Sequence, residues 1–143
     1  MRKAHMTTRS ILVIDDEESW LRFMRRVLAD CGYEVHTALT CAAGLELAVQ
    51  LEPDCILLDF HLTDGDAVSV CAALNSGENT RGLPVIVISG DPAAEIAAYA
   101  ECRAAAFLEK GTRCTQTIPA AIERILRERH GAPAIGGCAK IQE

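Results

Sequence analysis

Short, fully apolar segments recur along the chain, and each is followed by polar or charged residues. Strands of a sheet that is covered on both faces are apolar at every position, rather than at every second one. The β-branched content of these segments and their short length favour strands over helices. The expected strands are residues 10–14, 33–38, 55–58, 84–88 and 105–108.

Between these strands, apolar residues recur at every third or fourth position, which is the period of an amphipathic helix. Thr40 and Asp66 are suitable N-cap residues, whereas Gly32 and Pro53 are suitable helix ends. The expected helices cover about residues 20–28, 41–51, 67–74, 92–102 and 115–130.

The alternation of strands and helices predicts an α/β fold, a doubly wound parallel sheet with helices on both faces. The predicted domain spans residues 9–130. Residues 1–8 are expected to form an N-terminal extension, and residues 131–143, which contain Gly, Pro and Ala, a flexible tail or the start of a linker.

The charge and composition of the chain limit the partners and the cellular location that we expect for it. The net charge of −6 argues against direct DNA binding, which requires clustered basic residues. No apolar stretch is long enough for a membrane helix, and the first ten residues lack the features of a signal peptide. The seven cysteines include no C-x-x-C pair, which is typical of reduced thiols. We therefore expect a cytoplasmic protein without membrane contact.

Polar residues directly follow four of the predicted strands. In a doubly wound sheet, ligands bind outside the carboxyl ends of the strands. Asp15 and Asp16 follow the first strand, Asp59 the third, Ser89 the fourth and Lys110 the fifth. Three carboxylates in one crevice repel one another, and a hard divalent cation such as Mg²⁺ or Mn²⁺ removes that conflict. These side chains are therefore expected to meet around a metal ion.

Such a set can support phosphoryl transfer. One carboxylate can act as the nucleophile and form an aspartyl phosphate. The ammonium group of Lys110 and the hydroxyl of Ser89 are suited to stabilise the phosphoryl charge, because positioning and electrostatics dominate this chemistry.

Over about residues 9–129 the chain resembles the response-regulator receiver domains of two-component signalling. The segments that carry the resemblance are ILVIDDE (11–17), CGYEV (31–35), LLDFHL (57–62), VIVISG (85–90) and AFLEK (106–110). The resemblance implies a flavodoxin-like, five-stranded parallel sheet with strand order 2-1-3-4-5 and five helices.

The resemblance also implies roles at the site. Asp59 would be the phosphoacceptor. Asp16, Asp59 and the backbone carbonyl of His61 would bind Mg²⁺ directly, and Asp15 would act mainly through water. Ser89 would be the switch hydroxyl and Lys110 the ion partner of the phosphoryl group.

Three further positions follow from the same resemblance. Phe107 matches the aromatic residue that turns inward when the switch hydroxyl moves. His61 and Asp91, each two residues past a site residue, are expected to tune the lifetime of the phosphoryl group.

The expected partners are a histidine kinase or a histidine phosphotransfer protein. The chain would catalyse only its own phosphorylation and dephosphorylation, so it is not expected to be an enzyme otherwise. Its output would be a downstream protein or a homodimer, bound through helix 4, strand 5 and helix 5. Projection of helix 92–102 places Ala93, Ile96, Ala97 and Ala100 toward the sheet, and Ala98 and Tyr99 near the outer face.

Four residues depart from the family pattern. Thr63 replaces a proline, Ala67 a glycine, and Arg103 a glycine at a position that favours positive φ. Gly111 replaces a proline that often follows a cis peptide bond, so either a trans bond or a strained cis bond is expected.

Two other functions are compatible with parts of the pattern. A phosphohydrolase of the haloacid-dehalogenase type would need a second aspartate at the position of His61. A pseudo-receiver would bind partners without being phosphorylated, and Gly111 is the residue that favours it. The filled acidic, hydroxyl and lysine positions favour the phosphorylated switch over both.

Overall fold

The computed structural model of the protein describes residues 8–130, so the expectations for residues 1–7 and 131–143 lie outside the described residues. Five parallel strands form one sheet in the order β2-β1-β3-β6-β7. The strands are β1 (Ser10–Ile14), β2 (Glu34–Ala38), β3 (Cys55–Asp59), β6 (Val85–Ser89) and β7 (Ala106–Glu109). This is the expected order, and each strand begins and ends within one residue of the predicted range.

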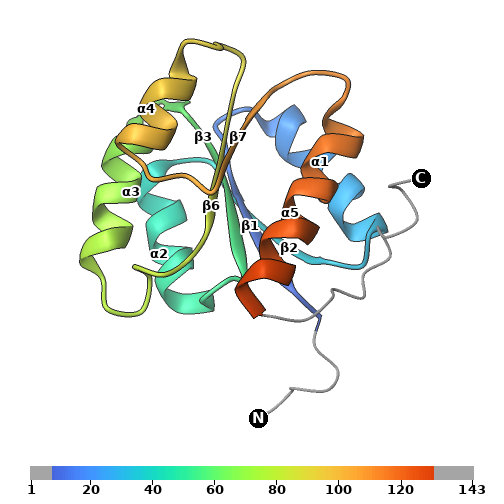
Figure 1. Ribbon diagram of the computed structural model, residues 1–143, viewed down its shortest axis with the longest axis horizontal. Coiled ribbons are helices and arrows are strands. Elements are labelled where there is room, and N and C mark those ends of the chain that lie inside the picture. Colours follow the sequence, from blue (N-terminus) through green and yellow to red (C-terminus); the bar gives the residue numbers. More distant parts are fainter. Residues whose placement is uncertain (1–7, 131–143) are drawn as a thin grey trace.

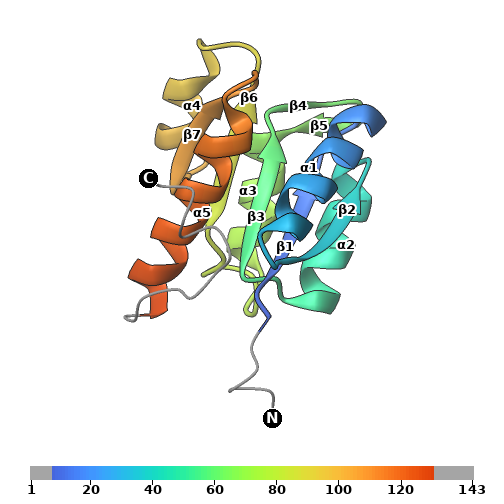
Figure 2. The same ribbon diagram turned by 90° about the vertical axis from the view of Figure 1, so that its right-hand side faces the viewer.

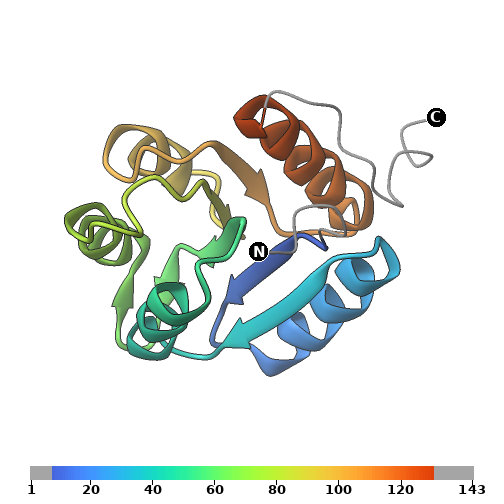
Figure 3. The same cartoon turned by 90° about the horizontal axis from the view of Figure 1, so that it is seen from below.

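Helices cover both faces of the sheet, as Figures 1 and 3 show. Helices α1 and α5 lie on one face, whereas α2, α3 and α4 lie on the other. The helices are α1 (Glu18–Asp30), α2 (Cys41–Leu51), α3 (Ala67–Ser76), α4 (Ala94–Ala100) and α5 (Cys114–His130). No helix among residues 8–130 is long and apolar enough to cross a lipid bilayer.

Local signals set several helix ends. The Thr40 side chain accepts a hydrogen bond from the Ala43 N–H, and Asp66 and Ser69 form a reciprocal capping box at the start of α3. Gly32, just after α1, has a φ of 93°, which glycine adopts without steric cost. The capping and stop residues of the sequence therefore act as predicted.

Glycine at position 44 allows α2 to lie close to the sheet. A Cβ atom at Gly44 would stand 2.5 Å from Cδ1 of Ile14, which is closer than carbon atoms can approach. The glycine that weakens α2 by propensity therefore permits the packing of α2 on β1.

The predicted orientation of the fourth helix is wrong. Helix α4 is shorter than expected, and its buried residues are Ala94 and Ala98, whereas Ile96 is 79% exposed. Alanine and isoleucine are both apolar, so the sequence shows little hydrophobic contrast along this helix, and the small methyl groups permit closer packing. Tyr99, predicted near the outer face, is exposed.

A two-stranded hairpin that the sequence did not reveal follows β3. Strands β4 (His61–Leu62) and β5 (Gly65–Asp66) pair antiparallel around a turn at Thr63 and Asp64. Figure 2 shows this hairpin beside the arrowhead of β3, at the rim where the strands end. The hairpin therefore borders the rim that carries the predicted site.

Candidate functional site

Three of the predicted site residues meet at the carboxyl-end rim of the sheet. Asp15 follows β1, Asp59 ends β3 and Lys110 follows β7. The Lys110 Nζ atom lies 2.8 Å from Oδ2 of Asp15 and 3.7 Å from Oδ1 of Asp59. Since β7 is the edge strand on the far side of β6, the long lysine side chain is what brings its charge to the central strands.

Asp16 completes a cluster of three carboxylates. One oxygen from each of Asp15, Asp16 and Asp59 lies within 4.8 Å of the other two. Asp15 is buried, Asp59 is partly buried and Asp16 is exposed, so the cluster has a dry side and a solvent side. Mg²⁺ prefers such hard oxygen donors and usually retains several waters. The donor set therefore fits the predicted cation.

Burial and nearby negative charges raise the pKa values of two of these carboxyl groups, Asp15 and Asp59. The pKa of Asp59 is raised to about 6, first by burial and then by the negative charge of Asp15. Burial also raises the pKa of Asp15 above its ordinary value, against the lowering effect of its hydrogen bond with Lys110. A cation between these groups would relieve the repulsion between them.

Lys110 is held as a cation by its neighbours. Burial alone would lower the pKa of Lys110, but the hydrogen bond and charge of Asp15, together with the charge of Asp59, outweigh it and raise the pKa. Oε1 of Glu17 lies 3.1 Å from Nζ, and the ring centroid of Trp20 lies 5.0 Å from it. Sequence reasoning missed both contacts. Glu17 directly follows the acidic pair, which was the available signal, whereas the helical period of Trp20 indicated only a core position.

The peptide bond between Lys110 and Gly111 was expected to be either trans or strained cis. No cis peptide bond occurs within residues 8–130, so the bond between Lys110 and Gly111 is trans. The Lys110 N–H donates to the Ser89 carbonyl at 3.0 Å. The lysine therefore reaches the carboxylates without the cis bond.

Ser89 ends β6 beside these groups. Its side chain is buried, and its Oγ accepts a hydrogen bond of 3.0 Å from the Asp91 N–H. Oδ1 of Asp91 in turn accepts from the Ala93 N–H at 3.0 Å. The hydroxyl of Ser89, the predicted switch residue, is thus hydrogen-bonded to the loop that leads into α4. Asp91 itself is exposed at the rim.

His61 and Asp64 lie in the hairpin that follows Asp59. His61 is exposed and contacts the Phe60 ring edge-on, with 4.9 Å between the ring centroids. Asp64 accepts hydrogen bonds from the Cys41 N–H at 2.8 Å and the Ala42 N–H at 3.2 Å, and the Cys41 bond is the main cause of its lowered pKa. This cap joins the hairpin to the start of α2, and no local sequence signal could reveal a bond across 23 positions.

Phe107, the predicted switch aromatic, is partly buried on the side of the sheet covered by α2, α3 and α4. Its backbone N–H donates to Oη of Tyr99 in α4 at 3.0 Å. The side chain that sequence reasoning placed near the outer face of α4 is therefore bonded to β7.

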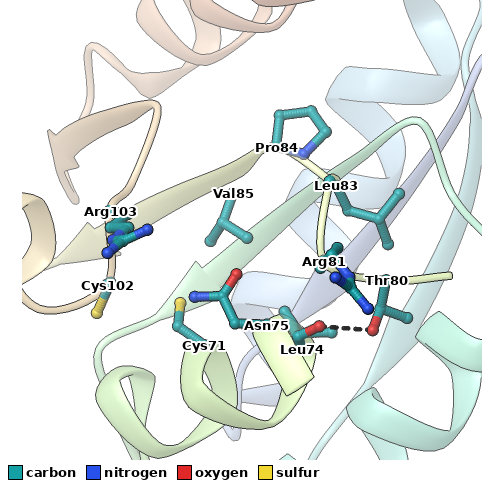
Figure 4. A pocket seen from close by; sticks show the side chains of 11 residues that line it. Cys71, Leu74, Asn75, Thr80, Arg81, Leu83, Pro84, Val85, Cys102 and Arg103 are labelled. Atoms are coloured by element: carbon teal, nitrogen blue, oxygen red, sulfur yellow. Dashed lines mark hydrogen bonds between the residues drawn. The ribbon is translucent and has the colours of Figure 1, made fainter. Parts of the chain in front are cut away.

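A cleft of about 290 Å³ lies away from the carboxylates. Figure 4 shows its walls, which include α3, the start of β6 and the residues before β7. Arg103 in this cleft has a φ of 55°, which agrees with the expectation that this position favours positive φ. The cleft lies at the amino end of β6, whereas the site lies at its carboxyl end.

Comparison with known proteins agrees with this geometry. A sequence model described as the response regulator receiver domain matches residues 11–123. The chain is 38% identical over 79 residues to the DNA-binding dual master transcriptional regulator RpaA of Synechocystis, which corresponds to 55% of this chain and 33% of RpaA. It is 38% identical over 84 residues to the transcriptional regulatory protein PrrA of Mycobacterium tuberculosis, which corresponds to 59% of this chain and 35% of PrrA. The chain thus spans about a third of the length of these curated relatives.

Solved structures share the fold. A CheY-like response regulator receiver domain protein from Methanospirillum hungatei superposes with a TM-score of 0.78 at 21% identity, over 87% of this chain and 98% of that one. The N-terminal domain of a response regulator receiver protein from Methanoculleus marisnigri gives a TM-score of 0.67 at 26% identity, over 84% and 98% of the two chains.

Proposed function

Because the chain belongs to the family of response regulator receiver domains, we propose that it accepts a phosphoryl group on Asp59 in a two-component phosphorelay. The donor would be the phosphohistidine of a histidine kinase or of a histidine phosphotransfer protein. The proposal rests on one observation. The carboxylates of Asp15 and Asp59 and the ammonium group of Lys110 lie close together at the carboxyl ends of the strands.

In this proposal each side chain has a chemical role. A carboxylate oxygen of Asp59 attacks the phosphorus atom while the bond from phosphorus to the donor imidazole nitrogen breaks. Because the pKa of Asp59 is about 6, this carboxyl group is mostly ionised at neutral pH and available as a nucleophile. Lys110 supplies positive charge beside the acceptor, and the Ser89 hydroxyl can donate a hydrogen bond to the transferred group.

The carboxylates of Asp15, Asp16 and Asp59 would hold Mg²⁺ or Mn²⁺, with the backbone carbonyl of His61 as a further ligand. When bound, the cation supplies charge neutralisation at the acceptor. The role of the chain is to keep three repelling carboxylates in place on two adjacent strands, β1 and β3, that buried side chains hold firmly.

We further propose that Ser89 and Phe107 switch the surface of α4, β7 and α5, which would bind a downstream protein or a second copy of the chain. His61 and Asp91 would tune the lifetime of the phosphoryl group from their exposed positions at the rim. In this view the chain catalyses its own phosphorylation and dephosphorylation and acts otherwise as a switch. The absence of direct DNA binding stays a prediction, because the chain covers a third of the relative whose name states DNA binding.

The two other functions have less support. A phosphohydrolase of the haloacid-dehalogenase type needs an aspartate where His61 stands. The pseudo-receiver interpretation was favoured by Gly111, but the Lys110 side chain that precedes it lies within hydrogen-bonding distance of Asp15.

The decisive experiment is phosphorylation by acetyl phosphate in the presence of Mg²⁺. Intact-protein mass spectrometry should show one added phosphoryl group, which alkali removes and acid preserves. Asp59→Asn should abolish the adduct, while Asp30→Asn, at an exposed position of α1, should leave it unchanged. An unmodified wild-type protein, or an adduct that persists in Asp59→Asn, would overturn the proposal.

A further inference from the structure

Helix α4 is attached to the sheet by little apolar surface. Its buried residues, Ala94 and Ala98, each contribute only one methyl group to this packing. Its larger apolar side chains, Ile96 and Tyr99, are exposed, and its N-cap residue Ala93 forms no side-chain cap. A single polar contact can therefore contribute as much to the position of α4 as the burial of either alanine.

That polar contact joins α4 to the edge strand of the sheet. Successive N–H groups of a strand point to opposite sides, and the Lys110 N–H points inward, to the Ser89 carbonyl on β6. The N–H of Phe107, three residues earlier, therefore faces the open edge of β7. There it donates to Oη of Tyr99 at 3.0 Å.

The other end of α4 is connected to the switch hydroxyl. The Ser89 Oγ accepts from the Asp91 N–H, and Asp91 Oδ1 accepts from the Ala93 N–H that precedes α4. These two polar attachments of the α4 segment, one at each end, therefore lead to the two residues assigned to the switch, Ser89 and Phe107.

We infer that Tyr99 is a positioning residue of the switch, whose hydroxyl holds α4 against β7 at Phe107 and thereby favours the resting conformation. The inference rests on the proposed function. If the phosphoryl group on Asp59 draws the Ser89 hydroxyl toward itself, the Asp91 N–H loses its acceptor and α4 is released at its amino end. The bond from Phe107 to Tyr99 then opposes the movement at the other end.

The size of the effect follows from the exposure of the bond. A net contribution of about 0.5–1 kcal/mol is expected for a hydrogen bond that water can replace. If the bond exists only in the resting conformation, its loss favours the active conformation by about two- to fivefold. Ligands that select the active conformation should then bind more tightly by the same factor.

Tyr99→Phe removes the acceptor and keeps the ring, so it tests the inference with little disturbance. In the full chain without ligand, the Phe107 amide should exchange with deuterium faster than in the wild type. In a titration with beryllofluoride at constant Mg²⁺, the variant should show an apparent affinity about two- to fivefold higher than the wild type. Tyr33→Phe is the matched control, because it removes the only other tyrosine hydroxyl, on the face covered by α1 and α5.

The outcomes separate the inference from the proposed function. If the wild type binds beryllofluoride and Tyr99→Phe binds it equally or more weakly, the role of Tyr99 is refuted while the proposed function stands. Unchanged exchange of the Phe107 amide would refute it as well. If the wild type does not bind beryllofluoride, the proposed function fails, and the role assigned to Tyr99 in the switch fails with it.

Discussion

Helices α4 and α5 both pack beside strand β7, but they are attached to the sheet in different ways. Helix α5 has 17 residues and buries large aliphatic side chains, among them Ile118, Ile122 and Leu126. Helix α4 has seven residues and buries Ala94 and Ala98. The two helices also lie on opposite faces of the sheet (Figure 3).

This difference indicates that α5 is held firmly against the sheet, whereas α4 can move at a smaller cost in free energy. Each large buried aliphatic side chain stabilises its contact by about 1.5–3 kcal/mol, several times more than an alanine methyl group. Moving α5 would therefore cost several kcal/mol of buried apolar contact, whereas moving α4 would cost much less. A switch built on this fold should act through α4 while α5 holds β7 and Lys110 in place.

The same substitution in the two helices gives the largest test of this comparison. Ile122→Ala in α5 should lower the free energy of unfolding by about 3 kcal/mol, because it leaves a cavity in a core where Ile122 is fully buried. Ile96→Ala in α4 should change it by less than about 0.5 kcal/mol, because Ile96 is 79% exposed. Urea unfolding of both variants measures the two values.

Similar losses in the two variants would contradict the comparison, and would mean that α4 is packed as firmly as α5. The pair also tests the orientation of α4 directly, since the hydrophobic pattern of the sequence had placed Ile96 toward the sheet.

An intermediate effect on the free energy of unfolding is expected for Asp59, whose carboxyl group lies at the end of β3. The pKa of Asp59 is raised from 3.8 to about 6, so the folded protein holds this proton more tightly than the unfolded chain does. Stability from this group is therefore complete below about pH 4 and is lost as the pH rises through 6. Without metal, Asp59→Asn should be more stable than the wild type by about 2–3 kcal/mol at pH 7.5, since a pKa raised from 3.8 to about 6 corresponds to at most about 3 kcal/mol.

The pH dependence and the response to metal identify the cause. The advantage of Asp59→Asn should shrink as the pH falls from 6 and vanish near pH 4, in thermal unfolding with a chelator present. Mg²⁺ should raise the Tm of the wild type more than that of the variant, because it relieves the same repulsion. A constant advantage at every pH would point to packing instead of charge.

The contrast between the two regions also explains what could be predicted from the sequence. Strands such as 55–59 and 85–89 were predictable because they are apolar at every position and end at a polar residue. That regularity predicted that Asp15, Asp59 and Lys110 lie at one rim of the sheet. It could not place α4, because a helix composed largely of alanine has no distinct apolar face.

Contacts between residues far apart in the chain account for the rest. Glu17 and Lys110 are 93 positions apart, and Asp64 caps a helix that begins 23 positions earlier. The local pattern around Trp20 and Asp64 indicates no partner at such a distance, and for Glu17 the only signal is its position directly after Asp15 and Asp16. The candidate site residues could be listed from the sequence, whereas the neighbours that hold them required the fold.

The smallest expected effect on the free energy of unfolding concerns the turn between α4 and β7, where the backbone is strained at Arg103. Arg103 has a φ of 55°, a conformation that costs a residue with a Cβ atom about 1–2 kcal/mol. Arg103→Gly removes that cost but adds chain entropy to the unfolded state, so a net gain of about 0.5–1 kcal/mol in unfolding free energy is expected. Arg81 faces the same cleft (Figure 4) but has an ordinary φ, and Arg81→Gly should bring no gain. Denaturant unfolding of both variants measures the difference, and an equal response would show that the arginine side chains, rather than the backbone of the turn, determine it.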